Sequence, residues 1–273
     1  MIDIAGLRFR YPGAGVDALA DLDLQVREGE FVVVVGANGC GKSTLARLLG
    51  GLDKPAAARR ALGCGQDLLT EDGRIAARRE IGVLFQNPEN QLVAECVEED
   101  IAFGLENLGW TSQAMREQVD RMLARFDLED LRRREPHLLS GGQKQRTALA
   151  GVLAVPRRVL VLDEPTAMLD PSGRREVLAA IDKLNDGGLA IVLITQEMDE
   201  VVGADRVIAL ESGTKVFEGM AAELFSNLSL VARLRLGLPA AGALALELRG
   251  RGLTLSHLPL TIDELLGQLT RSP

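Results

Sequence analysis

Short runs of apolar residues recur along the chain and are separated by longer segments of mixed composition. Each run has the length of a β-strand and is apolar at successive positions, which is typical of strands that are buried on both faces of a parallel sheet. Strands that alternate with helical segments indicate an α/β fold with a largely parallel sheet. The runs are FVVVV at 31–35, IGVLF at 81–85, VLVL at 159–162 and AIVLI at 190–194.

Helical spacing is clearest between residues 112 and 128, where apolar residues form one stripe along a helix. Ser112 is placed to cap this helix at its start. Residues 55–79, which are rich in Ala, Arg and Gly, show no comparable pattern. The stripe consists of Met115, Val119, Met122, Leu123 and Phe126, which recur at i, i+4, i+7, i+8 and i+11.

The pattern divides the chain into a main domain and a tail. LRFRY and DLDLQV alternate near the N-terminus, which predicts half-exposed strands in a small antiparallel β subdomain. We expect the main domain over residues 1–220, with a helical subdomain at about 87–145. From residue 221 to residue 273 the composition shifts to Leu, Ala and Gly with helical spacing, which predicts a separate C-terminal helical segment.

The composition narrows the class of protein. Acidic residues outnumber basic ones by 39 to 31, and this net charge of −8 argues against a nucleic-acid partner, which needs a basic face. Cys40, Cys64 and Cys96 form no CxxC pair, so a reducing cytosol fits better than a disulfide framework or a zinc site. The chain shows no signal-peptide pattern and no run near the ~18 apolar residues of a membrane span, so a membrane role would come through a partner.

A phosphate-binding loop is the strongest chemical signal. GANGCGKST lies between the run FVVVV and the helix-like LARLLGGL, which is the context that such a loop requires. Glycines let successive backbone N–H groups converge on phosphates, Lys42 neutralises their charge, and Ser43 can reach a Mg²⁺ ion. The predicted nucleotide-binding residues in this loop are Gly36, Asn38, Gly39, Cys40, Gly41, Lys42, Ser43 and Thr44.

Cys40 lies inside this loop, beside Lys42 and the start of a helix. Such surroundings lower the pKa of a thiol and raise its reactivity, so we expect a reactive thiol that bound nucleotide shields. The alternative is that Cys40 occupies a variable loop position and is sterically inert.

A pair of carboxylates follows the run VLVL. Asp163 and Glu164 lie at the end of this predicted strand, where parallel strand ends face a phosphate-binding loop. Asp163 is placed to hold a metal ion through water, and Glu164 to polarise an attacking water molecule. The pair therefore suits nucleotide hydrolysis.

LSGGQKQR, at residues 139–146, resembles the signature of the ATP-binding-cassette ATPases. With the phosphate loop, the DE pair, Gln86 after GVLF, and MLDP, it makes five matches in the order that the family shows. The resemblance implies an α/β fold with a P-loop NTPase core, the N-terminal antiparallel β subdomain, a helical signature subdomain and a C-terminal helical tail. It implies ATP and Mg²⁺ as ligands, and a dimer in which the signature binds the γ-phosphate held by the other subunit. The signature residues are Ser140, which can cap the helix, Gly141, Gly142 and Gln143.

The same resemblance assigns roles to residues outside these motifs. Gln86 would contact the Mg²⁺ ion and the attacking water, Asp170 in MLDP would lie at the nucleotide, and Tyr11 would stack on the adenine. For Tyr11 a second reading stays open. Leu7, Phe9 and Tyr11 share one face of an alternating strand, so Tyr11 is also consistent with plain core packing.

Within this family, the chain looks like the ATPase subunits of energy-coupling-factor transporters, including the cobalt and nickel systems. Such subunits work at the cytoplasmic face of the membrane, pair with a second ATPase subunit and dock on a transmembrane coupling protein. A separate membrane protein captures the vitamin or metal ion. We expect the docking groove on residues 87–105, and a tail that either joins two ATPase subunits or packs on its own domain. The segments that carry this likeness are FQNPENQ, VEEDIAFGLENLG, TAMLDPSGR, LGLP, LALELRGRG and PLTIDELL.

Gln196 departs from the family's pattern, which has a histidine at this position. If that histidine transferred a proton, Gln196 could not replace it, whereas a positioning role needs only an N–H donor, which the amide supplies. Since Glu164 already provides a base, we expect a slow but active enzyme. The alternatives are an ordinary importer ATPase and a dimerising regulatory module with weak or no hydrolysis. His137 and His257 are expected in loops and do not replace the histidine.

Overall fold

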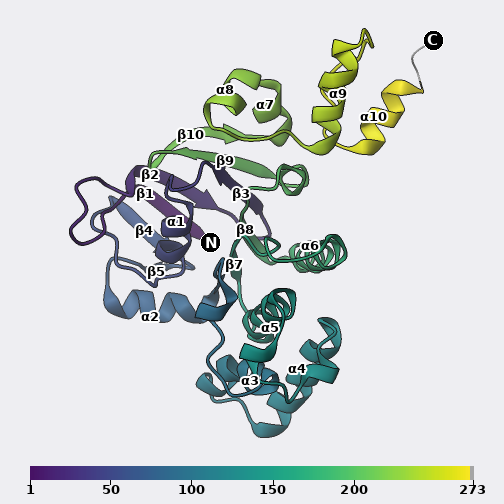
Figure 1. The fold of residues 1–273 in the computed structure, drawn as a ribbon. Coiled ribbons are helices and arrows are strands. Elements are labelled where there is room, and N and C mark those ends of the chain that lie inside the picture. The colour runs from purple at the N-terminus through teal and green to yellow at the C-terminus, as the bar shows by residue number, and fades with distance from the viewer. Residues whose placement is uncertain (271–273) are drawn as a thin grey trace.

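The computed structural model describes residues 1–270, and within them the chain forms two β-sheets with helices packed around them (Figure 1). The strands of the larger sheet are β3 (Phe31–Gly36), β6 (Ile81–Leu84), β7 (Val159–Asp163), β8 (Ala190–Ile194), β9 (Arg206–Glu211) and β10 (Thr214–Gly219). Their order is β10-β9-β3-β8-β7-β6, with all neighbours parallel except β10, which runs antiparallel to β9. The four apolar runs are confirmed as strands of a largely parallel sheet.

The smaller sheet is antiparallel, as the alternating N-terminal pattern predicts. Its strands are β1 (Ile2–Phe9), β2 (Leu19–Val26), β4 (Arg60–Gly63) and β5 (Gln66–Asp67), in the order β2-β1-β4-β5. β4, β5 and the helix α2 (Glu71–Glu80) occupy the segment in which the sequence shows no legible pattern. Thr70 caps α2, because its hydroxyl accepts the N–H of Gly73 at 3.1 Å.

Helices cover both faces of the larger sheet. Besides α2, they are α1 (Lys42–Leu49), α3 (Val97–Asn107), α4 (Ser112–Arg125), α5 (Gly141–Ala154) and α6 (Pro171–Asp186). α3, α4 and α5 pack against one another at the lower end of the molecule in Figure 1, and α1 lies between the two sheets. The signature therefore begins a helix of this lower unit, while the phosphate loop begins α1.

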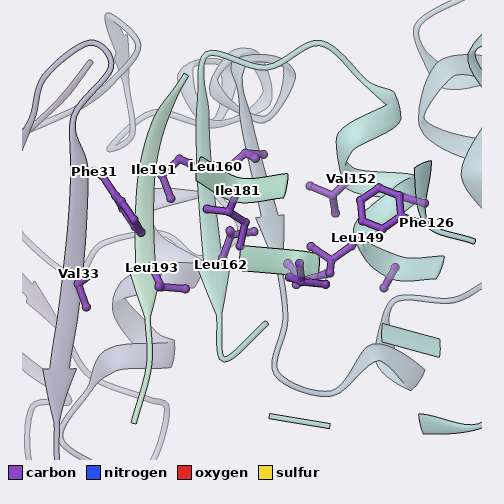
Figure 2. Packing of buried hydrophobic residues seen from close by; sticks show 14 of the residues in the cluster. Phe31, Val33, Phe126, Leu149, Val152, Leu160, Leu162, Ile181, Ile191 and Leu193 are labelled. Atoms are coloured by element: carbon purple, nitrogen blue, oxygen red, sulfur yellow. The ribbon is translucent and has the colours of Figure 1, made fainter. Parts of the chain in front are cut away.

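The central strands are buried because they separate two hydrophobic cores. Val33, Leu160 and Leu193 face one core, where they meet Leu149 of α5 and Ile181 of α6 (Figure 2). The alternate residues of the same strands face α1 and the smaller sheet; they include Val32, Val34, Val159, Val161, Val192 and Ile194. Burying each such side chain contributes about 1.5–3 kcal/mol, so the strand ends are held firmly in place.

The helix predicted over residues 112–128 differs from the observed α4 at both ends. Thr111, not Ser112, is the N-cap, and its hydroxyl accepts the N–H of Ala114 at 3.4 Å. The helix ends at Arg125 because the backbone of Asp127 adopts φ 53°, which no helix accommodates. The predicted apolar stripe nevertheless packs into the first core.

The C-terminal segment is helical, and its two halves pack differently. The first half, α7 (Ala221–Ser226) and α8 (Leu228–Arg233), joins the first core beside β9 and β10. The second half, α9 (Ala240–Gly250) and α10 (Ile262–Leu269), forms a small cluster of its own around Leu255 and Leu265. Among residues 1–270, no helix combines the length and the apolar character needed to cross a membrane.

Candidate active site

Side chains from four adjacent parallel strands meet at the carboxyl-terminal edge of the larger sheet. Asn38, Gln196, Glu164 and Gln86 follow β3, β8, β7 and β6, which is the order of these strands in the sheet. Gln196 Nε2 donates to Asn38 Oδ1 at 2.7 Å and to Glu164 Oε1 at 2.6 Å. Gln86 Nε2 donates to Glu164 Oε2 at 2.7 Å. The bonds form one continuous row that engages both oxygens of the Glu164 carboxylate.

The backbone of Glu164 is held in an unusual conformation. Its φ of 50° lies in the left-handed region, which is unfavourable by roughly 1–3 kcal/mol for a residue with a side chain of this size. Such strain persists where the surroundings fix it, and here the N–H of Glu164 donates to the carbonyl of Ile194 at 2.8 Å. The Glu164 side chain lines the same cleft as Lys42.

Gln196 meets two acceptors with one nitrogen. A primary amide nitrogen carries two hydrogens, so it can donate to Asn38 and Glu164 at the same time. A histidine ring nitrogen carries at most one hydrogen and would serve one of the two acceptors at a time. Gln196 therefore bridges the side chains of Asn38 and Glu164.

The phosphate loop wraps around the end of Lys42. The Lys42 ammonium is buried and donates to the carbonyls of Gly36 at 2.7 Å and Ala37 at 3.1 Å. At Gly36 a Cβ would lie 2.4 Å from the carbonyl oxygen of Leu210, and Gly41 adopts φ 110°. Only glycine fits these two positions, which explains the spacing of glycines in the loop.

Asp163 and Ser43 lie together beneath the phosphate loop. Asp163 is 4% exposed, and burial raises the pKa of its carboxyl group. A hydrogen bond with Ser43 and the charge of Lys42 lower that pKa, while the neighbouring Glu164 raises it. The result is a hydroxyl and a carboxylate side by side, a pair of oxygen donors of the kind that a hard cation prefers.

The phosphate loop and the four strand-end side chains line a cleft of about 960 Å³, whereas Asp163 and Gly36 are not among its lining residues. Lys42 and Glu164 lie among its lining residues, as do Tyr11 and Val16. Tyr11 is 43% exposed and lies beyond the end of β1, so the core-packing interpretation of this residue is wrong. Its ring meets Phe9 edge-on at 4.9 Å, and its hydroxyl lies 3.0 Å from Thr44 Oγ1. The cleft thus offers an aromatic ring and a phosphate loop within one space.

The signature residues lie in a different place. Ser140 and Gln143 form a capping box at the start of α5, with Ser140 Oγ accepting the N–H of Gln143 at 3.3 Å. Asp170 caps α6 and accepts the N–H of Gly173 at 2.9 Å. Ser140, Gly142, Gln143 and Asp170 line a second cleft, of about 410 Å³, which shares no lining residue with the first. One chain therefore does not bring its own signature to its own phosphate loop.

Two buried polar side chains beneath the row of strand-end residues are absent from the sequence interpretation. Gln145, on α5, is fully buried and donates to the carbonyl of Pro165 at 2.9 Å. Glu200 is 7% exposed and lies in the short 3₁₀ turn Met198–Val201. The sequence gives little sign of either residue. Gln145 in LSGGQKQR and Glu200 in EMDE are polar residue types that usually lie on the surface.

The histidines lie apart from this site. His137, expected in a loop, lies in the short 3₁₀ helix Pro136–Leu138, with its Nδ1 3.4 Å from a carboxyl oxygen of Glu135. His257 lies outside the helices and strands, as expected, and contacts Ser256. Neither histidine is among the lining residues of the cleft that contains Gln196.

Sequence comparison places the chain in a known family of nucleotide-binding proteins. Residues 19–167 match the ABC transporter family, so the chain belongs to that family of ATP-binding cassettes. Full-length relatives narrow the assignment to the energy-coupling factor transporter ATP-binding proteins. EcfA1 of Clostridium novyi is 44% identical over 98% of this chain and 97% of its own length. EcfA1 of Symbiobacterium thermophilum is 49% identical over 92% of this chain and 88% of its own length.

Solved structures show the same fold. CbiO1 of Clostridium perfringens, described as part of the ABC transporter complex CbiONQ, has a TM-score of 0.73 and is 34% identical. The match covers 89% of this chain and 98% of CbiO1. A dimeric ATP-binding cassette in a post-hydrolysis state with ADP and Pi has a TM-score of 0.76 at 27% identity, covering 81% of this chain and 99% of that one. The family resemblance seen in the sequence is confirmed.

The expectation of a reactive Cys40 thiol is wrong. The side chain is only 5% exposed and points at Gly36, so a reagent has little access to it. Burial raises the pKa of the Cys40 thiol, and this effect outweighs the charge of Lys42 and the backbone N–H groups of the loop, which lower it. The helix start and the lysine are present as the sequence implies, but desolvation of the thiolate dominates.

We expect Cys40 to react with iodoacetamide at least several-fold more slowly than Cys64 in the folded chain, because Cys64 is only half-buried while its thiol pKa is raised by the same cause. Peptide mass spectrometry of the native protein, labelled for increasing times, measures both rates, and the unfolded chain gives the reference. Fast labelling of Cys40 that Mg-ATP suppresses would contradict the burial of this thiol.

Proposed function

We propose that this chain is the ATP-binding and ATP-hydrolysing subunit of an energy-coupling-factor type transporter that takes up a micronutrient, either a metal ion or a vitamin. The observation that carries the hydrolytic part is the row of strand-end residues, in which two amides hold the Glu164 carboxylate at the mouth of the phosphate loop. The transport part is supported by relatives with this role that match 98% of the chain.

Nucleotide binding is the task of the phosphate loop and the apolar end of the cleft. The ring of Tyr11 offers a stacking surface for adenine, and the loop's N–H groups and Lys42 receive the phosphates. Because Lys42 is already bonded to two loop carbonyls, its ammonium is fixed before the nucleotide arrives. A fixed charge loses little freedom on binding, which favours tight capture of the phosphates.

The oxygen donors fit Mg²⁺, provided that the nucleotide completes the coordination. Ser43 and Asp163 supply a hydroxyl and a carboxylate, and Gln86 supplies an amide oxygen at the edge of the same cleft. Within the part of the chain that the structure describes, no group of three or more His, Cys, Asp or Glu side chains is placed to hold a metal ion. Mg²⁺ commonly uses one or two carboxylates plus phosphate oxygens. Bound there, it would neutralise charge on the phosphates.

Glu164 is the general base. A carboxylate oxygen has two lone-pair directions, so each Glu164 oxygen that accepts an amide N–H keeps one for a water molecule. Glu164 would orient that water toward the γ-phosphate and take its proton as the new P–O bond forms and the bond to ADP breaks. Gln86 and Gln196 keep the carboxylate aligned, because positioning accounts for much of phosphoryl-transfer catalysis.

Two chains are needed for a complete site. The signature and Asp170 line a cleft separate from the phosphate loop, so the signature of a second ATPase subunit must close over the nucleotide. The N–H groups at the start of α5 then meet the γ-phosphate. We place the dimer at the cytoplasmic face of the membrane as a peripheral unit. α9 and α10 would strengthen the pairing, because Leu244, Ile262 and Leu266 stay about half exposed on them.

A groove between α3 and β6 is the candidate docking surface for the transmembrane coupling protein. A cleft of about 280 Å³ opens there; residues of the expected segment 87–105 form one part of its lining, and β6 and α5 form most of the rest. Its lining includes Val93 and Phe103, which are 65% and 51% exposed. Exposed apolar side chains around a groove fit the apolar face of a partner helix. The micronutrient itself would bind to a separate membrane protein.

We predict that Glu164→Gln traps an ATP-bound dimer. The substitution removes the base, while the phosphate loop and the signature still hold nucleotide. Size-exclusion chromatography with Mg-ATP should show a dimer for the variant and a lower dimer fraction for the parent, which turns ATP over. A variant that stays monomeric, or that hydrolyses ATP as fast as the parent, would refute the role of Glu164.

For Gln196, we predict that the parent hydrolyses ATP measurably and that Gln196→Ala lowers kcat by about tenfold, or ~1.4 kcal/mol on the barrier, because one hydrogen bond to Glu164 is lost. Gln196→His should raise turnover modestly. Steady-state ATPase assays of the assembled complex compare the three proteins. A parent no more active than Glu164→Gln, and rescued only by histidine, would favour the regulatory module without hydrolysis.

Phe103→Glu should uncouple ATP binding from transport, since it places a charge in the docking groove without touching the nucleotide cleft. Uptake into reconstituted vesicles should fall at least tenfold, while ATP binding to the isolated subunit stays unchanged. Ile75→Glu is the matched control, because Ile75 is a similarly exposed apolar residue on α2, outside the groove. Normal uptake by the Phe103 variant would place the docking surface elsewhere.

A further inference from the structure

Glu200 is a buried acid to which the proposed hydrolytic mechanism assigns no role. Its carboxylate accepts two hydroxyl hydrogen bonds, from Thr166 Oγ1 to Oε1 at 2.5 Å and from Thr195 Oγ1 to Oε2 at 2.6 Å. Buried acids are rare unless they are paired, because desolvation disfavours the charged form. Glu200 bridges two loops, so its role is sought in the residues that those loops hold in place.

The two threonines belong to the loops that carry the catalytic carboxylate and its amide partner. Thr166 lies two residues after Glu164, and Thr195 directly precedes Gln196. The hydroxyl of Thr195 also accepts the N–H of Glu197 at 3.0 Å, which closes the turn around Gln196. Glu200 thus joins the Glu164 loop to the Gln196 turn from below, through side chains that do not reach the nucleotide cleft.

The two contacts of Glu200 engage both oxygens of its carboxyl group. Both oxygens accept from hydroxyl groups, an arrangement that a carboxylate satisfies fully. Burial raises the pKa of Glu200 above its ordinary value; the two hydroxyl groups and the guanidinium of Arg174 offset only part of this effect, and the charge of Glu197 adds to it. Arg174 itself forms an ion pair with Glu197 at 3.0 Å, so its charge acts on both the exposed Glu197 and the buried Glu200.

The Glu164 loop needs support from more than one side. Glu164 holds a strained φ of 50°, and Gln145 fixes the next carbonyl, that of Pro165, from the signature helix at 2.9 Å. The bond from Gln196 to Glu164 weakens steeply if the turn that carries Gln196 moves relative to this loop. Glu200 spans that junction directly.

We propose that Glu200 is a positioning residue for ATP hydrolysis, which ties the Glu164 loop to the Gln196 turn so that the Gln196 amide meets the Glu164 carboxylate. The proposal rests on the proposed function, since it names a further residue of the same reaction. Glu200 touches neither the nucleotide nor the attacking water. It acts through the threonines, and its effect belongs in kcat rather than in ATP affinity.

Glu200→Ala should lower kcat by about tenfold, with KM and the Kd for ATP unchanged, because the phosphate loop is intact. Glu200→Gln should recover most of the lost activity. Its amide oxygen can accept from Thr195, and its amide nitrogen can donate to the hydroxyl of Thr166, which then acts as acceptor. Thr166→Val keeps the size of the residue, removes one of the two bonds and should give an intermediate loss.

A double-mutant cycle separates positioning from general support of the fold. In a Gln196→Ala background, adding Glu200→Ala should lower kcat by less than about twofold, because the contact that Glu200 aligns is already gone. Glu30→Ala is the matched control: Glu30 is a mostly buried acid, paired with Arg206 away from the nucleotide cleft. Its loss should lower stability in urea unfolding and leave kcat per folded site unchanged.

If the double variant loses kcat by the product of the two single losses, Glu200 does not act through Gln196, and the positioning role is overturned. An unchanged kcat in Glu200→Ala would overturn it as well, and so would a fall in ATP affinity equal to the fall in kcat. If Glu200→Ala does not fold, Glu200→Gln and Thr166→Val decide in the same assays. A parent with no ATPase activity above Glu164→Gln overturns the proposed function and the positioning role together. An active parent with multiplying losses overturns the positioning role alone.

Discussion

The site depends on one constraint, the shared carboxyl-terminal edge of four neighbouring parallel strands. Asn38, Gln196, Glu164 and Gln86 leave β3, β8, β7 and β6 at that edge, and the strand spacing of about 4.8 Å brings successive side chains within hydrogen-bonding reach. The row of bonds needs every strand in register. A shift of one residue in any strand would turn its last side chain to the other face of the sheet.

The register is secured by burial rather than by the site itself. The inner strands β3, β7 and β8 are buried along their whole length, with alternate residues in two separate cores. That rigidity lets the protein hold local strain at Glu164 and two buried polar side chains, Gln145 and Glu200, beneath the Glu164 carboxylate. The signature lies on a helical unit beyond the edge of the sheet and lines a cleft separate from that of the phosphate loop.

Local patterns predict the parts of this arrangement that depend on neighbours in sequence. Apolar runs give the strands, and the glycines around Lys42 give the phosphate loop, because backbone geometry alone requires them. Features that depend on residues distant in sequence but close in space cannot be predicted from local sequence patterns. The buried thiol of Cys40 has a raised pKa despite a nearby lysine, and Glu200 shows its role only when the fold brings Thr166 and Thr195 together. The pattern predicts the wrong cap for α4 because, by residue type alone, Ser112 is a slightly better N-cap than the neighbouring Thr111.

The central claim is that each nucleotide site combines the phosphate loop of one chain with the signature of another. A tandem-linked dimer tests it directly, with one lesion, Lys42→Met, in the phosphate loop and another, Ser140→Arg, in the signature. If the sites are shared, two substitutions on different chains fall in the same nucleotide site, and the second site stays intact. Two substitutions on one chain fall in different sites, so both sites are inactivated. We therefore expect ATPase activity only in the dimer with separated lesions. Activity only in the dimer that carries both lesions on one chain would contradict the shared site.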